Sequence, residues 1–364
     1  MGQGSERPVI TTIVPTYRRP NLLRRAILSV LNQTYPHFHV WVYDNASGDE
    51  TASVVSQLAT IDPRIKYHCH STNIGAAKNF AYAIDRVATP LFSFLSDDDL
   101  LLPNLYKVAV ETLEAYPSAG FFAGATIHEN ERGMALTVSL RDWEEGLYEP
   151  PRGLLAMLQK GHPTWTGIVF RRACAEGFRR VHELTLSDLA FELQIASQRS
   201  FYATPTPVAI LTLHPAKKSA NLSWADLRIS IDAITAGLRE AWRVDSEIWR
   251  AVHCSWSERV SDMVSGYAIE RLIAKEAREA AEVLAYCRGD KSCVSKKWWV
   301  VDSLVRIANS NRRFRNLTAR TLAGMRRVAR VTRICQNGRY LEKYGIRPGQ
   351  SLQEEAATSV RAKK

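Results

Sequence analysis

Long hydrophobic runs and paired cysteines are both missing from this chain of 364 residues. No stretch of about 18 uncharged apolar residues occurs, so we expect no membrane-spanning helix. Residues 1–7 lead straight into an expected strand, without the apolar stretch of a signal peptide. The six cysteines are scattered, at Cys69, Cys174, Cys254, Cys287, Cys293 and Cys335. Their spacing favours reduced thiols over a disulfide framework or a zinc site, and we expect a cytoplasmic protein.

Acidic residues are missing from one long segment near the C-terminus. Residues 303–341 contain ten arginines, no lysine and no acid, and contribute +10 to the net charge of +11. Residues 342–364 contribute +2, which leaves residues 1–302 with a net charge of −1. The basic character therefore belongs to the C-terminal segment, and the rest of the chain is nearly neutral.

The first 130 residues alternate between strand-like and helix-like segments. Expected strands cover residues 9–15, 39–44, 64–70, 90–95 and 120–127. Expected helices cover residues 20–31, 76–88 and 103–115, and a capping box from Ser47 to Glu50 predicts another helix to about residue 59. This alternation predicts an α/β fold, with a mostly parallel sheet and helices on both of its faces.

The second half of the chain changes character. Two further strands are expected at residues 165–172 and 207–213, with a short helix at 189–196 between them, and only helices from 225 to about 335. With 46% hydrophobic residues, the chain can bury a full core. We expect one domain over residues 1–220, with halves at about 8–128 and 129–215. A helical region at 221–364 follows it.

The triplet Asp97-Asp98-Asp99 directly follows the expected strand at residues 90–95. It therefore lies at the carboxyl end of that strand, where open α/β sheets place their ligands. Adjacent carboxylates repel one another unless a cation or a sugar hydroxyl compensates them. An ordinary acidic turn is the alternative.

Five segments of the chain, in order, resemble motifs of the family 2 glycosyltransferases. They are Pro15 to Arg19, followed by residues 29–33, 43–51, 73–79 and 95–103. The resemblance covers roughly residues 8–215. It implies the GT-A fold, a Rossmann-like sheet, and metal-dependent transfer of a sugar with inversion from a nucleotide-sugar donor such as a UDP- or dTDP-sugar.

The resemblance places the nucleotide at the ends of the first two strands. Pro15, Thr16 and Tyr17 fall in the donor-binding motif, where Tyr17 provides an aromatic wall for the base. Asp44 ends the second strand and accepts hydrogen bonds from the base or the ribose. The alternative for Asp44 is an Asx-turn with the residues that follow it.

The donor phosphates and the metal are assigned to two further motifs. Lys78 matches the family position that carries a cation near the donor, although it can equally be a solvated helix lysine. In the acidic motif, Ser96 stands where the family often has its first acid. Asp98 falls on the metal position, and Asp97 takes ribose or sugar contacts. Mg²⁺ or Mn²⁺ suits one or two carboxylates together with phosphate oxygens.

The acceptor side is predicted around residues 184–193. Ser187 is expected to cap a helix, and Asp188 matches the family's catalytic base, which takes the proton of the acceptor hydroxyl. A helix N-terminus also favours an acid there for its dipole alone. Glu192, one turn later, is the rival base.

His214 follows the last expected strand and matches a family histidine that completes the metal shell or contacts the diphosphate. Lys217 and Lys218 come directly after it and are expected to close over the diphosphate. The alternative for His214 is a surface histidine in a turn.

The arginine-rich segment at 303–341 has the pattern of a basic amphipathic helix. That pattern is typical of contact with an anionic membrane surface, which suits a peripheral enzyme with a glycan, lipid-linked or small-molecule hydroxyl acceptor. A solvated face packed on the main domain is an equal alternative. Nucleic-acid binding is a third, but no recognised motif supports it.

Two other functions remain open alongside the transferase. The first is a binding protein that has kept the fold and lost catalysis. The second is a nucleotidyltransferase, although those enzymes carry a Gly-rich loop after the first strand, and Thr16 to Pro20 contain no glycine.

Overall fold

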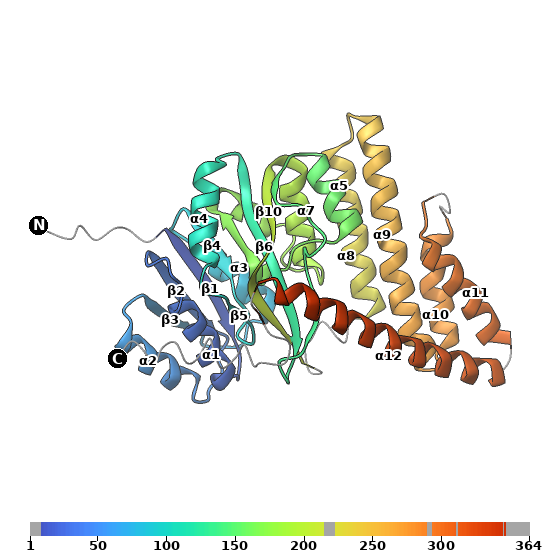
Figure 1. Ribbon diagram of the computed structural model, residues 1–364, viewed down its shortest axis with the longest axis horizontal. Coiled ribbons are helices and arrows are strands. Elements are labelled where there is room, and N and C mark those ends of the chain that lie inside the picture. The colour runs from blue at the N-terminus through green and yellow to red at the C-terminus, as the bar shows by residue number, and fades with distance from the viewer. Residues whose placement is uncertain (1–8, 215–222, 290–292, 311, 345, 347–364) are drawn as a thin grey trace, which may run out of the picture.

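The computed structural model describes residues 9–214, 223–289, 293–310, 312–344 and 346 (Figure 1). Its strands are β1 (Ile10–Thr16), β2 (Phe38–Asp44), β3 (Ile65–Cys69), β4 (Leu91–Phe94), β5 (Leu100–Leu101), β6 (Ala119–Asn130), β7 (Ala135–Val138), β8 (Gly146–Tyr148), β9 (Ile168–Arg171) and β10 (Ser200–Leu213). Its helices are α1 (Pro20–Leu31), α2 (Thr51–Ile61), α3 (Ala76–Ile84), α4 (Leu105–Ala115), α5 (Arg152–Lys160), α6 (Ala175–Phe178), α7 (Ser187–Gln198), α8 (Trp224–Ala241), α9 (Ser246–Ile273), α10 (Ala277–Ala285), α11 (Lys296–Ser310) and α12 (Arg312–Glu342).

One mixed sheet organises the first two thirds of the chain. Its strand order is β3-β2-β1-β4-β9-β6-β10-β5, with β7 on β6 and β8 on β10. The four strands β3, β2, β1 and β4 are parallel, whereas β9 runs antiparallel between β4 and β6. The prediction of a mostly parallel α/β sheet is confirmed. Strand order reverses at β1, so the crevice beside its carboxyl end is where such sheets bind ligands.

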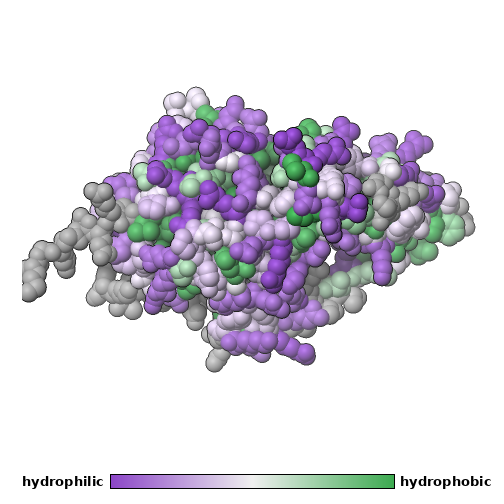
Figure 2. All heavy atoms as spheres, turned by 90° about the horizontal axis from the view of Figure 1, so that it is seen from above, coloured by the Kyte–Doolittle hydropathy of each residue, from purple (hydrophilic) through white to green (hydrophobic). Residues whose placement is uncertain are grey.

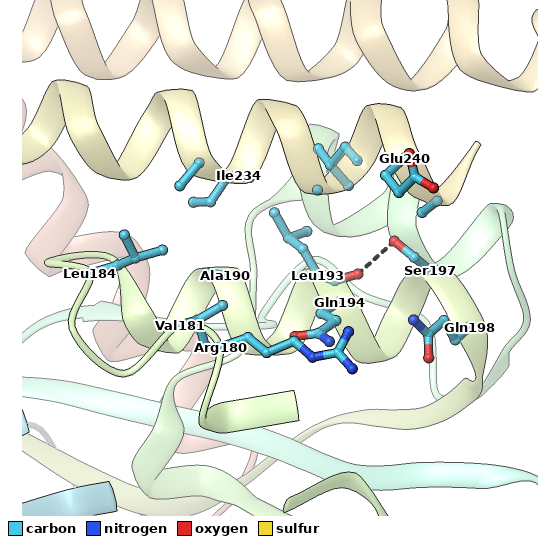
Figure 3. A pocket seen from close by; sticks show the side chains of 14 residues that line it. Arg180, Val181, Leu184, Ala190, Leu193, Gln194, Ser197, Gln198, Ile234 and Glu240 are labelled. Carbon is cyan, nitrogen blue, oxygen red and sulfur yellow. Dashed lines mark hydrogen bonds between the residues drawn. The ribbon is translucent and has the colours of Figure 1, made fainter. Parts of the chain in front are cut away.

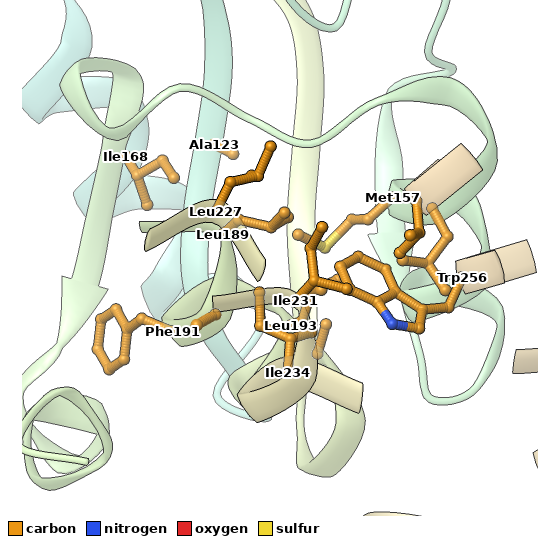
Figure 4. Packing of buried hydrophobic residues seen from close by; sticks show 14 of the residues in the cluster. Ala123, Met157, Ile168, Leu189, Phe191, Leu193, Leu227, Ile231, Ile234 and Trp256 are labelled. Atoms are coloured by element: carbon orange, nitrogen blue, oxygen red, sulfur yellow. The ribbon is translucent and has the colours of Figure 1, made fainter. Parts of the chain in front are cut away.

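Two buried clusters cover the two faces of this sheet, because successive strand residues point to opposite sides. On one face, α1, α2 and α4 pack through residues such as Ile27, Val55 and Ala109. On the other face, α3, α5 and α7 pack together with the helices that follow. Figure 4 shows this second cluster, where Ala123 of β6 and Leu193 of α7 lie with Trp256 of α9 in one apolar core.

The C-terminal helices therefore share their core with the sheet. In Figure 1, α12 runs back from the far end of these helices to the sheet. There, Arg141 donates to Asn337 at 3.2 Å, and the Tyr340 hydroxyl donates to the carbonyl of Pro205. The predicted division into residues 1–220 and 221–364 stays a prediction.

Several expected element boundaries are wrong, and each has a local reason. The capping box does not form: α2 begins at Thr51, whose backbone N–H is bound by Asp49, while Ser47 donates to Asp44 instead. Ser187 is the first residue of α7, not its cap. The expected strand at 165 starts with a 3-10 turn, η1 (Trp165–Gly167), before β9, and the last strand begins earlier than predicted, at Ser200.

Candidate functional site

Three strand ends place the predicted donor residues next to one another. In the parallel register of β1 and β2, Thr16 pairs with Asp44. β4 lies on the other side of β1, with Phe94 opposite Ile13, so the acidic triplet follows beside the end of β1. The predicted residues Pro15, Thr16, Asp44 and the acidic triplet therefore meet at one edge of the sheet, which is its switch point.

Asp97 and Asp98 share one cation from the first motif. Nη1 of Arg19 lies 3.1 Å from Oδ1 of Asp97 and 3.0 Å from Oδ2 of Asp98. Thr16 donates its hydroxyl proton to Oδ2 of Asp97 at 2.7 Å. Both carboxylates are buried, and burial raises the pKa of Asp97 despite Arg19 and Thr16. The pair therefore concentrates negative charge that requires a compensating cation.

Asp99 differs from the other two acids. Its Oδ2 accepts a hydrogen bond from the Thr166 hydroxyl at 2.7 Å, and its Oδ1 accepts one from the backbone N–H of Thr212 at 3.0 Å. It thus ties the acidic turn to η1 and to the end of β10. We assign Asp99 a structural role, because protein donors bind both of its oxygens.

His214 lies against the acidic turn. Its Nε2 is 3.2 Å from Oδ2 of Asp98, and its Nδ1 is 3.2 Å from Oε1 of Glu131. A carboxylate on one ring nitrogen orients the other nitrogen, as in metal-bound histidines. A hollow of about 520 Å³ opens beside this ring, lined by Asn130, Glu131, Arg132, Met134, Leu136, Leu213 and His214. The expected partners Lys217 and Lys218 lie outside the described residues.

Asp98 and His214 fit a divalent cation that has few protein ligands. Within the described part of the chain, no group of three or more His, Cys, Asp or Glu side chains is arranged to hold a metal. A cation here would need oxygen ligands from elsewhere, and Mg²⁺ and Mn²⁺ commonly take them from phosphates. Arg19 already shows that this position attracts positive charge.

Asp44 forms the other end of the site. Ser47 donates to its Oδ1 through its backbone N–H at 3.0 Å and its hydroxyl at 2.5 Å, so the predicted turn alternative is present. The hydroxyl of Tyr67 donates to its Oδ2 at 2.6 Å. These donors fix the orientation of a carboxylate that is only 2% exposed. This carboxylate can still accept a hydrogen bond from an incoming ligand, because each oxygen has two lone pairs.

The rim of this end carries the two exposed predicted residues. Tyr17 is 39% exposed, with the guanidinium of Arg18 5.1 Å from its ring centroid. Lys78 is exposed on α3, next to Asn79, whose amide donates to the carbonyl of Tyr43 at 2.9 Å. Gly75, with a φ of +84°, begins this helix in a conformation that favours glycine. The structure thus places Tyr17 and Lys78 at the surface, Tyr17 directly after the strand end that pairs with Asp44 and Lys78 in the first turn of α3.

The predicted acceptor side contains three titratable groups, of which Glu192 is buried while Asp188 and His162 are half-buried. Asp188 lies in the first turn of α7, and its Oδ1 accepts from the N–H of Leu189 at 2.8 Å. One turn later, Glu192 is fully buried, and its Oε2 lies 3.1 Å from Nδ1 of His162. Burial raises the pKa of Glu192 to about 7, and Asp188 adds to that rise.

A different cavity lies on the opposite face of α7. Figure 3 shows it between α7 and α8, lined by apolar side chains such as Leu193 and Ile234, with the charged side chains of Arg180 and Glu240 also at its wall. Since Leu193 and Ser197 point away from the Asp188–Glu192 face, this cavity does not belong to the acidic site.

Sequence reasoning missed three contributors: Arg19, Tyr67 and His162. Arg19 lies inside the first motif, three residues after the end of β1, where a cation was a usable signal. Tyr67 and His162 carry no local signal, because they meet Asp44 and Glu192 only through the packing of β3 and the loop before η1.

Comparisons with known proteins agree with this geometry. Residues 11–178 match the sequence model of the family described as Glycosyl transferase family 2. The chain carries a family 2 glycosyltransferase domain. This confirms the resemblance drawn from the five motifs.

Two curated relatives of this domain have names from glycan synthesis. A GalNAc(5)-diNAcBac-PP-undecaprenol beta-1,3-glucosyltransferase of Campylobacter jejuni is 28% identical over 198 residues, covering 54% of this chain and 62% of the relative. The putative teichuronic acid biosynthesis glycosyltransferase TuaG of Bacillus subtilis is 31% identical over 121 residues, covering 33% and 48%. The chain therefore spans less than two thirds of the length of these relatives.

Solved structures share the fold at low identity. S. aureus TarS 1-349 superposes with a TM-score of 0.58 at 17% identity, covering 88% of this chain and 91% of that one. Its complex with UDP-GlcNAc gives a TM-score of 0.55 at 15% identity, covering 82% and 91%. The family 2 domain of this chain thus has the GT-A fold.

Proposed function

We propose that this protein transfers a sugar from a UDP- or dTDP-sugar to a hydroxyl acceptor with inversion, with a divalent cation in the site. The observation that carries the proposal is the cluster of Asp97, Asp98 and His214 at the switch point of the sheet. Open α/β sheets bind their ligands in this crevice, which would here receive the nucleotide-sugar. The cluster supplies negative charge for a cation that would lie at the phosphates of the donor. The TarS relative has been solved with UDP-GlcNAc, which supports a uridine donor.

The donor half of the site would hold the nucleotide from two sides. The Tyr17 ring is exposed for stacking on the base, and Asp44, held by Ser47 and Tyr67, accepts from the base or the ribose. Lys78 is exposed on α3, where its charge would lie near the donor. In this arrangement the diphosphate extends toward Asp97 and Asp98.

Asp98 and His214 would hold Mn²⁺ or Mg²⁺. The cation, when bound, neutralises charge on the leaving nucleoside diphosphate. Arg19 would also contribute, because its Nη1 contacts the same oxygen of Asp98, Oδ2, that faces His214. With a cation held by Asp98 and His214, the guanidinium of Arg19 would be available to bind the phosphates, for which its planar donors are suited.

Asp188 is our candidate for the catalytic base. It is half-buried in the first turn of α7. In a single displacement, its carboxylate takes the proton of the acceptor hydroxyl while the acceptor oxygen bonds to the anomeric carbon, and the bond to the diphosphate breaks on the opposite face. Glu192 is less suited, because it is fully buried and already engaged by His162.

We also propose that the acceptor is a glycan or a lipid-linked glycan, assembled on the cytoplasmic face of a membrane. The Campylobacter jejuni and Bacillus subtilis relatives, both named for glycan synthesis, support this class of acceptor. Apolar side chains are exposed along α11 and α12, among them Trp299, Phe314 and Leu317. Figure 2 shows hydrophobic atoms at the end of the molecule where these helices lie.

Basic residues flank those apolar side chains. Lys296, Lys297, Arg306 and Arg320 are exposed on the same two helices. This combination suits an anionic membrane surface, on which apolar side chains insert and cations meet lipid phosphates. The side chains of Arg312, Arg313, Arg327, Arg330 and Arg333 lie outside the described ones. No helix in the described ranges is long and apolar enough to cross a bilayer.

Release of nucleoside diphosphate tests the proposal without knowledge of the acceptor, because water can replace the acceptor hydroxyl. Wild-type protein with Mn²⁺ is incubated with a panel of UDP-, dTDP- and GDP-sugars, beside Asp98→Asn and the surface control Glu183→Gln. We expect one uridine or thymidine donor to be consumed by wild type and by the control, and not by Asp98→Asn. Consumption of no donor, or equal consumption by Asp98→Asn, would contradict the proposal.

A further inference from the structure

The strongest unassigned feature is the cavity between α7 and α8, on the face of α7 opposite Asp188 (Figure 3). Its volume is about 330 Å³, which is at the lower end of the range of small-molecule sites. Leu193 of α7 forms its apolar wall together with Ile234 and Leu238 of α8, and all three side chains are buried. The cavity can therefore receive a small apolar group.

Small residues on both helices leave this space open. On α8, Ala233, Gly237 and Ala241 line the cavity at intervals of four residues, so they share one face of the helix. Ala190 lines it from α7. A Cβ added at Gly237 would meet no atom within 4 Å beyond its chain neighbours and its own helix backbone. The side chains of the two helices therefore do not fill the cavity.

A polar hollow of about 260 Å³ adjoins the apolar cavity. Arg180, Gln194 and Gln198 line both spaces, so the two meet at these side chains. Figure 3 shows Arg180 and Gln194 on the side of the cavity that lies across from Ile234. The two spaces thus form one continuous site, with an apolar part between the helices and a polar part beside α6.

Positive charge is in excess in the polar hollow. Arg180 and Arg199 line it together with one acid, Glu176. Among the described residues, neither arginine forms an ion pair. Glu240, the acid at the wall of the apolar cavity, is compensated by Arg243 at 3.2 Å. The two arginines therefore offer a place for an anion at the polar end, and guanidinium groups bind phosphates well.

Gln194 carries a hydrogen-bonding group that the protein leaves unused. Its Oε1 is buried and has no hydrogen-bond partner within the described part of the chain. The amide lies over Gly177 of α6, where an added Cβ would come within 3.2 Å of this oxygen. A buried acceptor without a donor is unfavourable, so a ligand that brings a hydroxyl group to this point would be favoured.

We propose that the cavity and the polar hollow bind a single-chain lipid phosphate that also carries a hydroxyl group. The phosphate meets Arg180 and Arg199, the hydroxyl donates to Gln194, and the apolar chain enters the cavity between α7 and α8. This site uses neither Asp188 nor the acidic turn. It is therefore independent of the proposed transfer reaction, and either can fail without the other.

Isothermal titration calorimetry of the full chain tests the chemistry of the ligand. The probes are a short-chain lysophosphatidic acid below its micellar concentration, the matching monoacylglycerol without the phosphate, and glycerol 3-phosphate without the chain. We expect the lysophosphatidic acid to bind more tightly than either fragment, by about tenfold or more. Equal affinity for either fragment would overturn the proposal, and so would the absence of lysophosphatidic acid binding.

Two variants with matched controls locate the ligand. Gly237→Phe places a ring in the cavity, and Ala236→Phe makes the same change one position earlier, at an exposed residue that does not line it. Arg180→Gln removes one cation of the hollow, and Arg179→Gln removes its neighbour, which pairs with Asp85 instead. We expect Gly237→Phe to abolish binding and Arg180→Gln to weaken it about tenfold, whereas both controls bind as wild type.

Thermal unfolding of each variant distinguishes loss of the site from loss of the fold. If Gly237→Phe does not fold, Ala233→Leu replaces it as the variant that fills the cavity. A folded variant with a filled cavity and wild-type affinity would overturn the position of the chain, and unchanged affinity in Arg180→Gln would overturn that of the phosphate. Asp98→Asn should keep the affinity for lysophosphatidic acid. Loss of that affinity in Asp98→Asn would place the lipid in the acidic site and contradict this inference alone.

Discussion

Replacement of Arg19 by glutamine tests whether this side chain occupies the place of a cation. Removing one partner from a buried ion pair costs about 3 to 5 kcal/mol. The Arg19 side chain is 36% exposed, whereas those of Asp97 and Asp98 are 7% and 2% exposed, so water screens part of the loss. We therefore expect a decrease of about 2 kcal/mol in the free energy of unfolding.

The assay is thermal unfolding with and without Mn²⁺. A chain of this size shifts by about 2 °C for each kcal/mol, so Arg19→Gln should melt about 4 °C below wild type. Mn²⁺ at about 100 times its Kd raises the free energy of unfolding by about 2.7 kcal/mol for a protein that binds it only when folded. Because wild type must first move Arg19 from Asp98, Mn²⁺ should stabilise Arg19→Gln more than wild type.

Arg24→Gln is the matched control, since Arg24 is exposed on the same helix. In addition, Asp98→Asn combined with Arg19→Gln should be more stable than Arg19→Gln alone, because the uncompensated carboxylate is gone. If Arg19→Gln unfolds at the same temperature as wild type, or if Mn²⁺ raises the unfolding temperature of both proteins equally, Arg19 does not compensate the acidic pair and this reasoning is refuted.

Three further predictions follow from named contacts. Tyr67→Phe removes one donor to Asp44 and should weaken binding of the donor nucleotide about fivefold in calorimetry, corresponding to about 1 kcal/mol; unchanged affinity would contradict a role for Asp44. Trp256→Ala should lower stability by about 3 to 5 kcal/mol in a single unfolding transition, while the exposed Trp299→Ala has little effect. Two separate transitions would show that α9 does not share the core. Glu192 and His162 both have raised pKa values, so the folded protein binds more protons than the unfolded chain and stability falls as pH rises from about 4.5 through 7. Chemical denaturation at a series of pH values should show that the free energy of unfolding decreases less with pH in Glu192→Gln than in wild type. An equal decrease in both proteins would contradict the raised pKa values of the pair.

The local pattern of the sequence predicted the sheet and the strand ends that form one edge of the candidate site. Strand ends at Thr16 and Asp44 follow directly from apolar runs, and parallel strands necessarily bring such ends to one edge. The proximity of Asp98 and His214, 116 positions apart, was accessible only because the family resemblance aligned both. The pattern of hydrophobic and polar residues alone does not predict that these two side chains lie close together.

Contacts that depend on packing were beyond the sequence. Ser47 matched a capping box, but its hydroxyl donates to Asp44 three residues earlier, so the alternative Asx-turn forms in place of the cap. His162 precedes the short 3-10 turn at Trp165, and only the close approach of α7 brings it to Glu192. The polar groups that deviate from local rules are thus the ones around the site.

Calorimetric binding of UDP, dTDP and GDP, each with and without Mn²⁺, to wild type and Asp98→Asn tests the central claim most directly. We predict that UDP or dTDP binds wild type, that binding requires the cation, and that Asp98→Asn abolishes it. Binding of none of the three nucleotides, or metal-independent binding that survives Asp98→Asn, would contradict the assignment of this crevice as a metal-dependent nucleotide-sugar site.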